Sequence, residues 1–217
     1  ISIKLYAGGK MRFKEKFIKI FIIIFIMQFV FYKYSYATSD NQAIVPNDEQ
    51  IDGEMRIYSE SAILIENKTG KVLYEKDMHA RKYPASTTKI LTAILAIEKC
   101  DLKEVQIASD AAVNSIKPGY STANIQVGET FTVEELLNVM IIHSANEAAN
   151  ILAEHISGSM GEFAKLMNEK AKEIGCLDTN FVNANGAHDE NHYSTAYDMA
   201  LIARYCMQNE TFRKLVT

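Results

Sequence analysis

The 217-residue sequence predicts a mixed α/β domain in which a β-hairpin precedes a block of helices. β-prone residues alternate on both sides of a turn near residue 67, and from residue 86 onward the apolar residues take helical spacing behind capping motifs. Hydrophobic residues make up 48% and charged residues 23%, which excludes wholesale disorder. The net charge of −4 argues against nucleic acid as a partner, because phosphate binding needs a basic face.

The first 37 residues differ in composition from the rest. They carry seven Lys or Arg and only Glu15 as an acid, followed by an apolar run over Ile20–Met27 that Phe29–Tyr32 extends. Ser35-Tyr36-Ala37 then offers small residues for cleavage. We predict upstream residues and a secretory signal peptide over 1–37, with an uncleaved signal anchor as the alternative. The protein is therefore expected to be exported and to act outside the cytoplasm, at the cell wall or the outer face of the membrane.

A polar stretch follows the signal segment and is predicted to be a linker over 38–58. The domain proper would occupy 59–217. Its three cysteines, Cys100, Cys176 and Cys206, are an odd number without CxxC spacing, so at least one stays free or pairs between chains. We expect them to be small packing residues rather than metal ligands or nucleophiles.

The hairpin is predicted from Ser61–Glu66 and Lys71–Lys76 around the turn Asn67-Lys68-Thr69-Gly70. Capping motifs and apolar spacing then predict five helices. These are Thr88–Lys99, Thr132 to about Ile142, Glu147 to Ile156, Ser159 to Gly175, and Thr195 to about Met207 as the last helix.

The first candidate for chemistry is Ser86, three residues before Lys89. Positions i and i+3 share a helix face, so the hydroxyl and the amine can meet. A serine needs a base to become a nucleophile, and a lysine desolvated in an apolar helix has a lowered pKa and can serve as that base. The alternative is a capping serine beside a surface lysine, since the SxxK pattern is common by chance.

The second candidate is Ser144-Ala145-Asn146, which falls between two predicted helices. A hydroxyl and an amide two residues apart could relay a proton and hold a substrate amide. The alternative is an interhelix turn in which Ser or Asn caps the next helix.

Together these motifs resemble those of the penicillin-recognising serine enzymes. Pro84–Lys89 is similar to the nucleophile motif of the D-alanyl-D-alanine carboxypeptidases, the low-molecular-mass penicillin-binding proteins of peptidase family S11. Ser144–Ala148 resembles the SGNDA segment of that family, and Asn183–Asp189 resembles its NPHGLHD loop. The resemblance implies the β-lactamase/transpeptidase-like α/β fold, here as a hairpin and helical block without the family's later sheet strands.

The resemblance also implies an activity, which is removal of the terminal D-Ala from peptidoglycan stem peptides through an acyl-enzyme. Ser86 would be the nucleophile, Lys89 the general base, Ser144 a proton relay and Asn146 a substrate-binding residue. The peptidoglycan pentapeptide would be the substrate and β-lactams covalent inhibitors, with no cofactor and no metal. The membrane would be contacted only through the signal segment or an anchor that this sequence lacks.

One departure concerns the third family motif, KTG, which follows the helical block and binds the substrate carboxylate. No Lys-Thr-Gly follows Asn146, and Lys68-Thr69-Gly70 is read as a hairpin turn. We therefore expect a truncated catalytic domain with impaired activity, because the loss of even one oxyanion donor costs on the order of 10²–10³ in rate.

Three alternatives remain open at this point. His188 and His192 are spaced like the zinc-binding HExxH motif, but Asp189 stands where that motif has Glu. A class A β-lactamase would need a deacylating Glu after the SxN segment, whereas Glu134-Glu135-Leu136-Leu137-Asn138 precedes it. The absent KTG would suit a secreted, non-catalytic module derived from the same fold.

Overall fold

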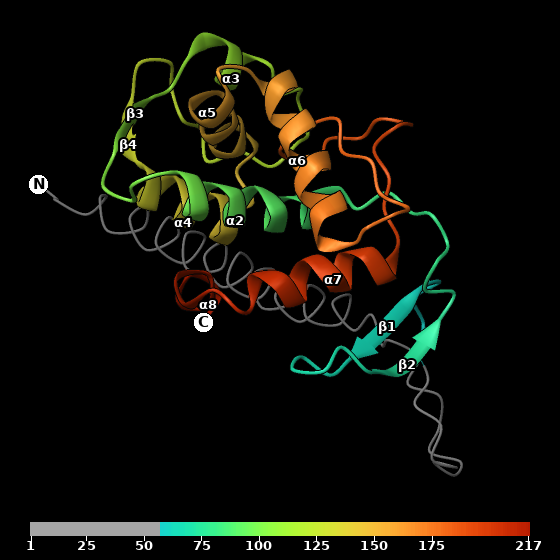
Figure 1. Ribbon diagram of the computed structural model, residues 1–217. Coiled ribbons are helices and arrows are strands. Elements are labelled where there is room, and N and C mark those ends of the chain that lie inside the picture. The colour runs from blue at the N-terminus through green and yellow to red at the C-terminus, as the bar shows by residue number, and fades with distance from the viewer. Residues whose placement is uncertain (1–56) are drawn as a thin grey trace, which may run out of the picture. The chain divides into compact units, whose positions relative to one another are not determined.

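The computed structural model describes residues 57–217 (Figure 1). The predicted signal segment and nearly all of the predicted linker lie outside the described residues. The strands are β1 (Ala62–Ile65), β2 (Val72–Lys76), β3 (Val105–Ile107) and β4 (Thr130–Thr132). The helices are the 3₁₀ turn η1 (Ala85–Thr88), α2 (Lys89–Lys99), α3 (Asp110–Asn114), α4 (Val133–Ile142), α5 (Asn146–Ser157), α6 (Met160–Ile174), α7 (Ala196–Cys206) and α8 (Glu210–Val216).

Helices α2 and α5 form the centre of the core. The stretch Leu91–Ala96 of α2 and the stretch Asn146–Ala153 of α5 are buried without interruption. A helix that is buried all round needs neighbours on every side, and α4, α6, α7 and α8 supply them around α2, while α3, α4 and α6 contact α5. Alanines on both central helices allow their backbones to approach closely.

The hairpin of β1 and β2 is antiparallel, as predicted, with an irregular register between Leu64 and Ile65. Its turn lies against α7, where Arg204 donates hydrogen bonds to the carbonyl groups of Asn67 and Lys68. An isolated hairpin is only marginally stable in water, so this contact with α7 helps to hold it.

The five predicted helices are confirmed to within one or two residues, but the sequence did not predict β3, β4, α3 or α8. The prediction that the helix ending near Met207 is the last one is therefore wrong, because Asn209 caps α8. Strands β3 and β4 pair antiparallel in a second two-stranded sheet. These elements are three to seven residues long, which is too short to show hydrophobic periodicity. Among residues 57–217, no helix is long and apolar enough to cross a membrane.

Capping motifs set the helix starts. Thr132 accepts a hydrogen bond from the Glu135 N–H, and the Glu135 carboxylate accepts one from the Thr132 N–H, which completes a capping box at α4. At α6 and α7 the serine or threonine half of the predicted box is present, from Ser159 and Thr195.

Replacement of the α4 cap tests this assignment. We expect Thr132→Ala to lower the free energy of unfolding by about 1 kcal/mol in a urea titration, because the helix loses a cap acceptor. Glu135→Gln is the control, since a glutamine can still bond back to the cap residue and should change stability much less. Equal losses for the two variants would contradict the role of the Thr132 hydroxyl.

Candidate active site

Ser86 and Lys89 lie at the junction between the 3₁₀ turn η1 and helix α2. The Lys89 Nζ atom is 3.3 Å from the Ser86 Oγ atom, so the i, i+3 spacing brings the two groups together as predicted. Ser86 is exposed, whereas Lys89 is only 2% exposed. The Ser86 hydroxyl can therefore be reached from solvent, while the Lys89 amine is removed from water.

The burial of Lys89 changes its chemistry. Desolvation is the main cause that lowers the pKa of Lys89 to about 8, and the negative charge of Glu147 opposes the shift. The Lys89 Nζ atom also donates to the carbonyl oxygen of Asn185 at 2.6 Å. A neutral amine that donates one N–H to this carbonyl keeps its lone pair for the Ser86 hydroxyl, which is the arrangement of a general base.

The hydroxyl of Ser144 also contacts Ser86. It lies between α4 and α5, and its Oγ atom donates to the Ser86 Oγ atom at 3.1 Å. The backbone of Ser144 has a φ of 54°, and Ala85, next to the nucleophile, has a φ of 47°. Such angles are unfavourable for residues with a Cβ atom and occur disproportionately at functional sites.

Asn146 is the first residue of α5 and is 4% exposed. Its N–H donates to the carbonyl of Ser121, which ties the start of α5 to the loop between α3 and β4. The neighbouring Glu147 holds the same loop, because its Oε1 atom accepts hydrogen bonds from the Thr122 hydroxyl and from the Ala123 N–H at 2.6 and 2.7 Å. Glu147 is 1% exposed, and its Oε2 atom is buried without a hydrogen-bond partner among the described residues.

The loop Asn183–Ala187 forms the third wall of the site. Besides the Asn185 carbonyl, the Ala184 carbonyl accepts a hydrogen bond from Thr92 of α2. Gly186 has a φ of +83°, and a Cβ atom there would lie 1.9 Å from the Ala85 carbonyl oxygen. Only glycine, which has no Cβ atom, fits so close to Ala85 in the 3₁₀ turn η1.

The two histidines of the HExxH-like segment have separate partners. His192 is buried, its Nδ1 atom accepts from the Val182 N–H, and its Nε2 atom contacts the Thr88 hydroxyl at 2.8 Å. His188 packs edge-to-face against Tyr83. Desolvation lowers the pKa of His192 to about 4, so its ring is neutral and supports the turn before Lys89. Because both ring nitrogens of His192 are engaged, the geometry does not support a zinc site there.

Two further sequence motifs, the ExxLN-like string and the early Lys-Thr-Gly, have structural roles. Glu134, the acidic residue of the ExxLN-like string, is exposed in the first turn of α4, the neighbouring Glu135 caps that helix, and among the described residues no hydrogen bond joins either carboxylate to Ser86. Lys68-Thr69-Gly70 lies in the turn of the first hairpin, as predicted, where the Glu66 carboxylate accepts from the Lys68 and Thr69 N–H groups.

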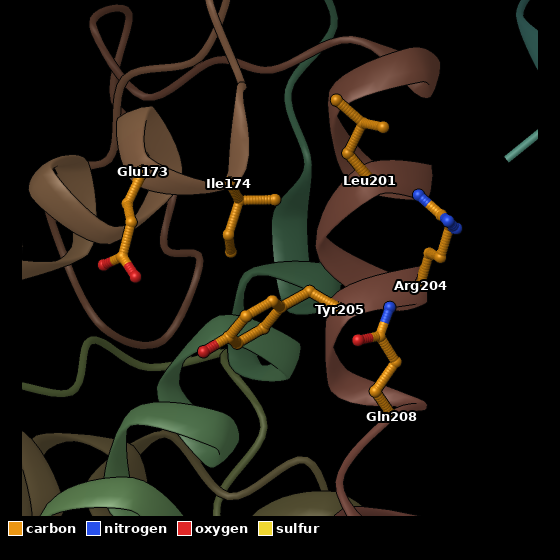
Figure 2. A pocket seen from close by; sticks show the side chains of 6 residues that line it. All are labelled: Glu173, Ile174, Leu201, Arg204, Tyr205 and Gln208. Atoms are coloured by element: carbon orange, nitrogen blue, oxygen red, sulfur yellow. The ribbon is translucent and has the colours of Figure 1, made fainter. Parts of the chain in front are cut away.

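A surface pocket between α6 and α7 contains none of the predicted site residues (Figure 2). It is lined by Glu173, Ile174, Leu201, Arg204, Tyr205 and Gln208. The Tyr205 hydroxyl donates to Glu98 of α2, and Lys170 forms ion pairs with Glu98 and Glu173. These contacts join α2, α6 and α7, so we interpret this region as structural.

Comparison with known proteins decides the family. The sequence profile of the D-alanyl-D-alanine carboxypeptidases, peptidase family S11, matches residues 47–217. The chain belongs to this family. The S11 relative DacF of Bacillus subtilis, a D-alanyl-D-alanine carboxypeptidase, is 40% identical over 174 residues, which are 79% of this chain and 45% of DacF.

Solved S11 structures confirm the predicted transpeptidase-like fold. The D-alanyl-D-alanine carboxypeptidase DacD of Francisella tularensis is 33% identical with a TM-score of 0.68, over 74% of this chain and 39% of that one. Penicillin binding protein 5 of Haemophilus influenzae is 28% identical with a TM-score of 0.70, over 75% of this chain and 49% of that one. The chain thus spans about half or less of the length of these relatives.

Of the four residues predicted from the sequence, Ser86, Lys89 and Ser144 are brought into contact, whereas Asn146 is described only with a backbone hydrogen bond to Ser121, and the groups that support the site were not predicted. These supporting groups are the Asn185 carbonyl, Gly186 and Glu147. A glycine between two predicted helices and an acidic residue at the start of an apolar helix are weak signals, and neither reveals which segment it contacts. Only the packed structure shows that these residues lie against the turn before Lys89 or the loop beside Asn146.

The close approach of Gly186 can be tested with a matched pair of glycines. Gly158, the C-cap of α5, also has a positive φ, but nothing lies within 4 Å of a Cβ atom placed there. We expect Gly158→Ala to cost about 1–2 kcal/mol of unfolding free energy from its backbone angle alone. Gly186→Ala adds a steric clash and should cost about 3 kcal/mol or more. Similar costs in urea titrations would contradict the close contact with Ala85.

Proposed function

We propose that this chain carries the nucleophile half of a serine D-Ala-D-Ala carboxypeptidase that removes the terminal D-Ala from peptidoglycan stem peptides. The observation that carries the proposal is the convergence on the Ser86 Oγ atom of the buried Lys89 amine and the Ser144 hydroxyl. Family membership supports the same activity. No described contact favours the β-lactamase or the non-catalytic module over this function.

In the acylation step, the neutral Lys89 amine takes the proton of Ser86 while the Ser86 Oγ atom attacks the carbonyl carbon of the D-Ala-D-Ala peptide bond. The hydrogen bond from Lys89 to the Asn185 carbonyl holds the amine in place, so little reorganisation is needed. The Ser86 N–H, at the start of the turn, would supply one donor to the developing oxyanion.

Collapse of the tetrahedral intermediate breaks the C–N bond and releases D-Ala. Its amine must gain a proton, and in this proposal Ser144 passes one from Lys89; the contact between the Ser144 hydroxyl and the Ser86 Oγ atom supports this role. Asn146, at the start of α5, would hold the backbone of the substrate. Water then hydrolyses the Ser86 ester and regenerates the hydroxyl.

The substrate partner in this proposal is a peptidoglycan pentapeptide, and a β-lactam would acylate the same serine by opening its ring. Because peptidoglycan lies outside the cytoplasm, the proposal includes export by the basic and apolar N-terminal segment of the sequence. No cofactor enters any step.

Covalent labelling tests the nucleophile and the base. We expect the purified 217-residue chain to form an adduct with a fluorescent penicillin on Ser86, located by peptide mass spectrometry. Ser86→Ala should abolish the adduct. Lys89→Arg should slow its formation about 10²-fold or more, since an arginine does not lose its proton and cannot act as a base.

Lys103→Arg is the matched control, because Lys103 is exposed and makes no side-chain contact with the site. It should label at the unsubstituted rate. An adduct that persists in Ser86→Ala, or undiminished labelling of Lys89→Arg, would overturn the assignment. Release of D-Ala from a model pentapeptide, measured in parallel, separates acylation from complete turnover.

The pH dependence of labelling follows from the pKa of Lys89. Below a pH of about 8 the amine is largely protonated and cannot accept a proton, so the rate should rise with pH and level off above that value. Glu147→Gln removes the charge that raises this pKa, and the midpoint should move to lower pH.

The control for this shift is Glu154→Gln on the same helix, two turns away, where the carboxylate pairs with Ser109 rather than acting on Lys89. Its midpoint should match that of the unsubstituted chain. A midpoint that stays in place in Glu147→Gln would show that another group controls the rate.

A further inference from the structure

Three potential metal ligands meet on the side of the fold that carries β3. Cys100 is the C-cap residue of α2, Glu104 immediately precedes β3, and His155 lies in the last turn of α5. Each contributes one ligand atom, and the three atoms lie within 4.8 Å of one another. None of these residues takes part in the proposed reaction of Ser86.

The orientation of the side chains suits a shared cation. The Nε2 atom of His155 lies 3.1 Å from the Oε2 atom of Glu104 and 3.2 Å from the Nε2 atom of Gln106, so a bound ion would replace the contact with Gln106. Zinc binds sulfur at about 2.3 Å and nitrogen or oxygen at about 2.0–2.2 Å, so tetrahedral geometry places its ligand atoms about 3.4–3.6 Å apart. The imidazole and the carboxylate are already near this separation, and small rotations of the side chains would bring in the thiol.

The state of the cysteine agrees with this arrangement. Cys100 is free and half-buried, whereas the other two cysteines, Cys176 and Cys206, are buried. All three cysteines pack in or against the hydrophobic core, as predicted, but only Cys100 is partly exposed.

We propose that Cys100, Glu104 and His155 bind a zinc ion. Sulfur, imidazole nitrogen and carboxylate oxygen are the ligand types that zinc takes in proteins, and a water molecule would complete four-coordination. On binding, the Cys100 thiol transfers its proton to solvent and the thiolate bonds to the metal. The ion would join the end of α2 to the end of α5 and to the strand pair of β3 and β4.

Zinc titration tests the site. The purified 217-residue chain, stripped with a chelator, is titrated with zinc in competition with a chromophoric indicator, and one zinc per chain is expected. Cys100→Ser and His155→Gln should each weaken binding at least about tenfold, since even the loss of residues that only orient metal ligands costs that much. His143→Gln is the matched control, because His143 is exposed at the C-cap of α4 and should leave the affinity unchanged.

A second measurement needs no variant. In the folded chain a thiol reagent should modify Cys100 first, because the other two cysteines are buried. Stoichiometric zinc should slow this modification at least about tenfold, and magnesium should not, because magnesium does not take thiolate ligands. Failure to bind zinc at micromolar concentration, equal affinity in both ligand variants and the control, or modification of Cys100 that zinc leaves unchanged would each overturn the proposal.

Discussion

The site depends on the burial of a single amine. Lys89 is 2% exposed in the first turn of α2, and removal of water from its side chain lowers its pKa to about 8. A lysine with its ordinary pKa would be almost entirely charged at neutral pH, whereas a pKa of about 8 leaves a fraction of the amine neutral and able to accept a proton from Ser86. A strongly desolvated lysine without a nearby acid would be a weaker base. The charge of Glu147 opposes the shift, so the basicity of Lys89 reflects a balance between burial and one buried carboxylate.

Several parts of the structure are needed to keep this amine in place. The loop Asn183–Ala187 closes over α2, and its Asn185 carbonyl accepts the hydrogen bond that orients the Lys89 Nζ atom. This closure requires glycine at position 186, and the site also contains unfavourable positive φ angles at Ala85 and Ser144. Such angles cost about 1–2 kcal/mol each. The two helices that begin just after these residues, α2 and α5, are also extensively buried, so the site is anchored to the core.

The longer elements could be predicted because their signals are local. Apolar spacing and cap residues located α2, α4, α5, α6 and α7, and the turn residues located the first hairpin. The sequence did not predict strands β3 and β4 or the short helices α3 and α8. Segments of three to seven residues show too little hydrophobic periodicity, and their stability comes from tertiary contacts. In the site, the contact between Ser86 and Lys89 could be predicted from helical spacing. Ser144 and Asn146 could be interpreted as site residues only in combination with that pair. The supporting Gly186, Glu147 and the Asn185 carbonyl had no comparable signal.

The sequence by itself determined that a hydroxyl and an amine would stand one helical turn apart, because the positions of i and i+3 neighbours follow from backbone geometry alone. Only the tertiary structure decided that the amine is desolvated, that Ser144 reaches the Ser86 hydroxyl from 58 residues along the chain, and that Cys100 lies beside His155 rather than within the core. The physical reason is that the pKa of a group and the meeting of distant segments depend on what packs around them. Those neighbours are supplied by the whole fold and not by the adjacent residues of the chain.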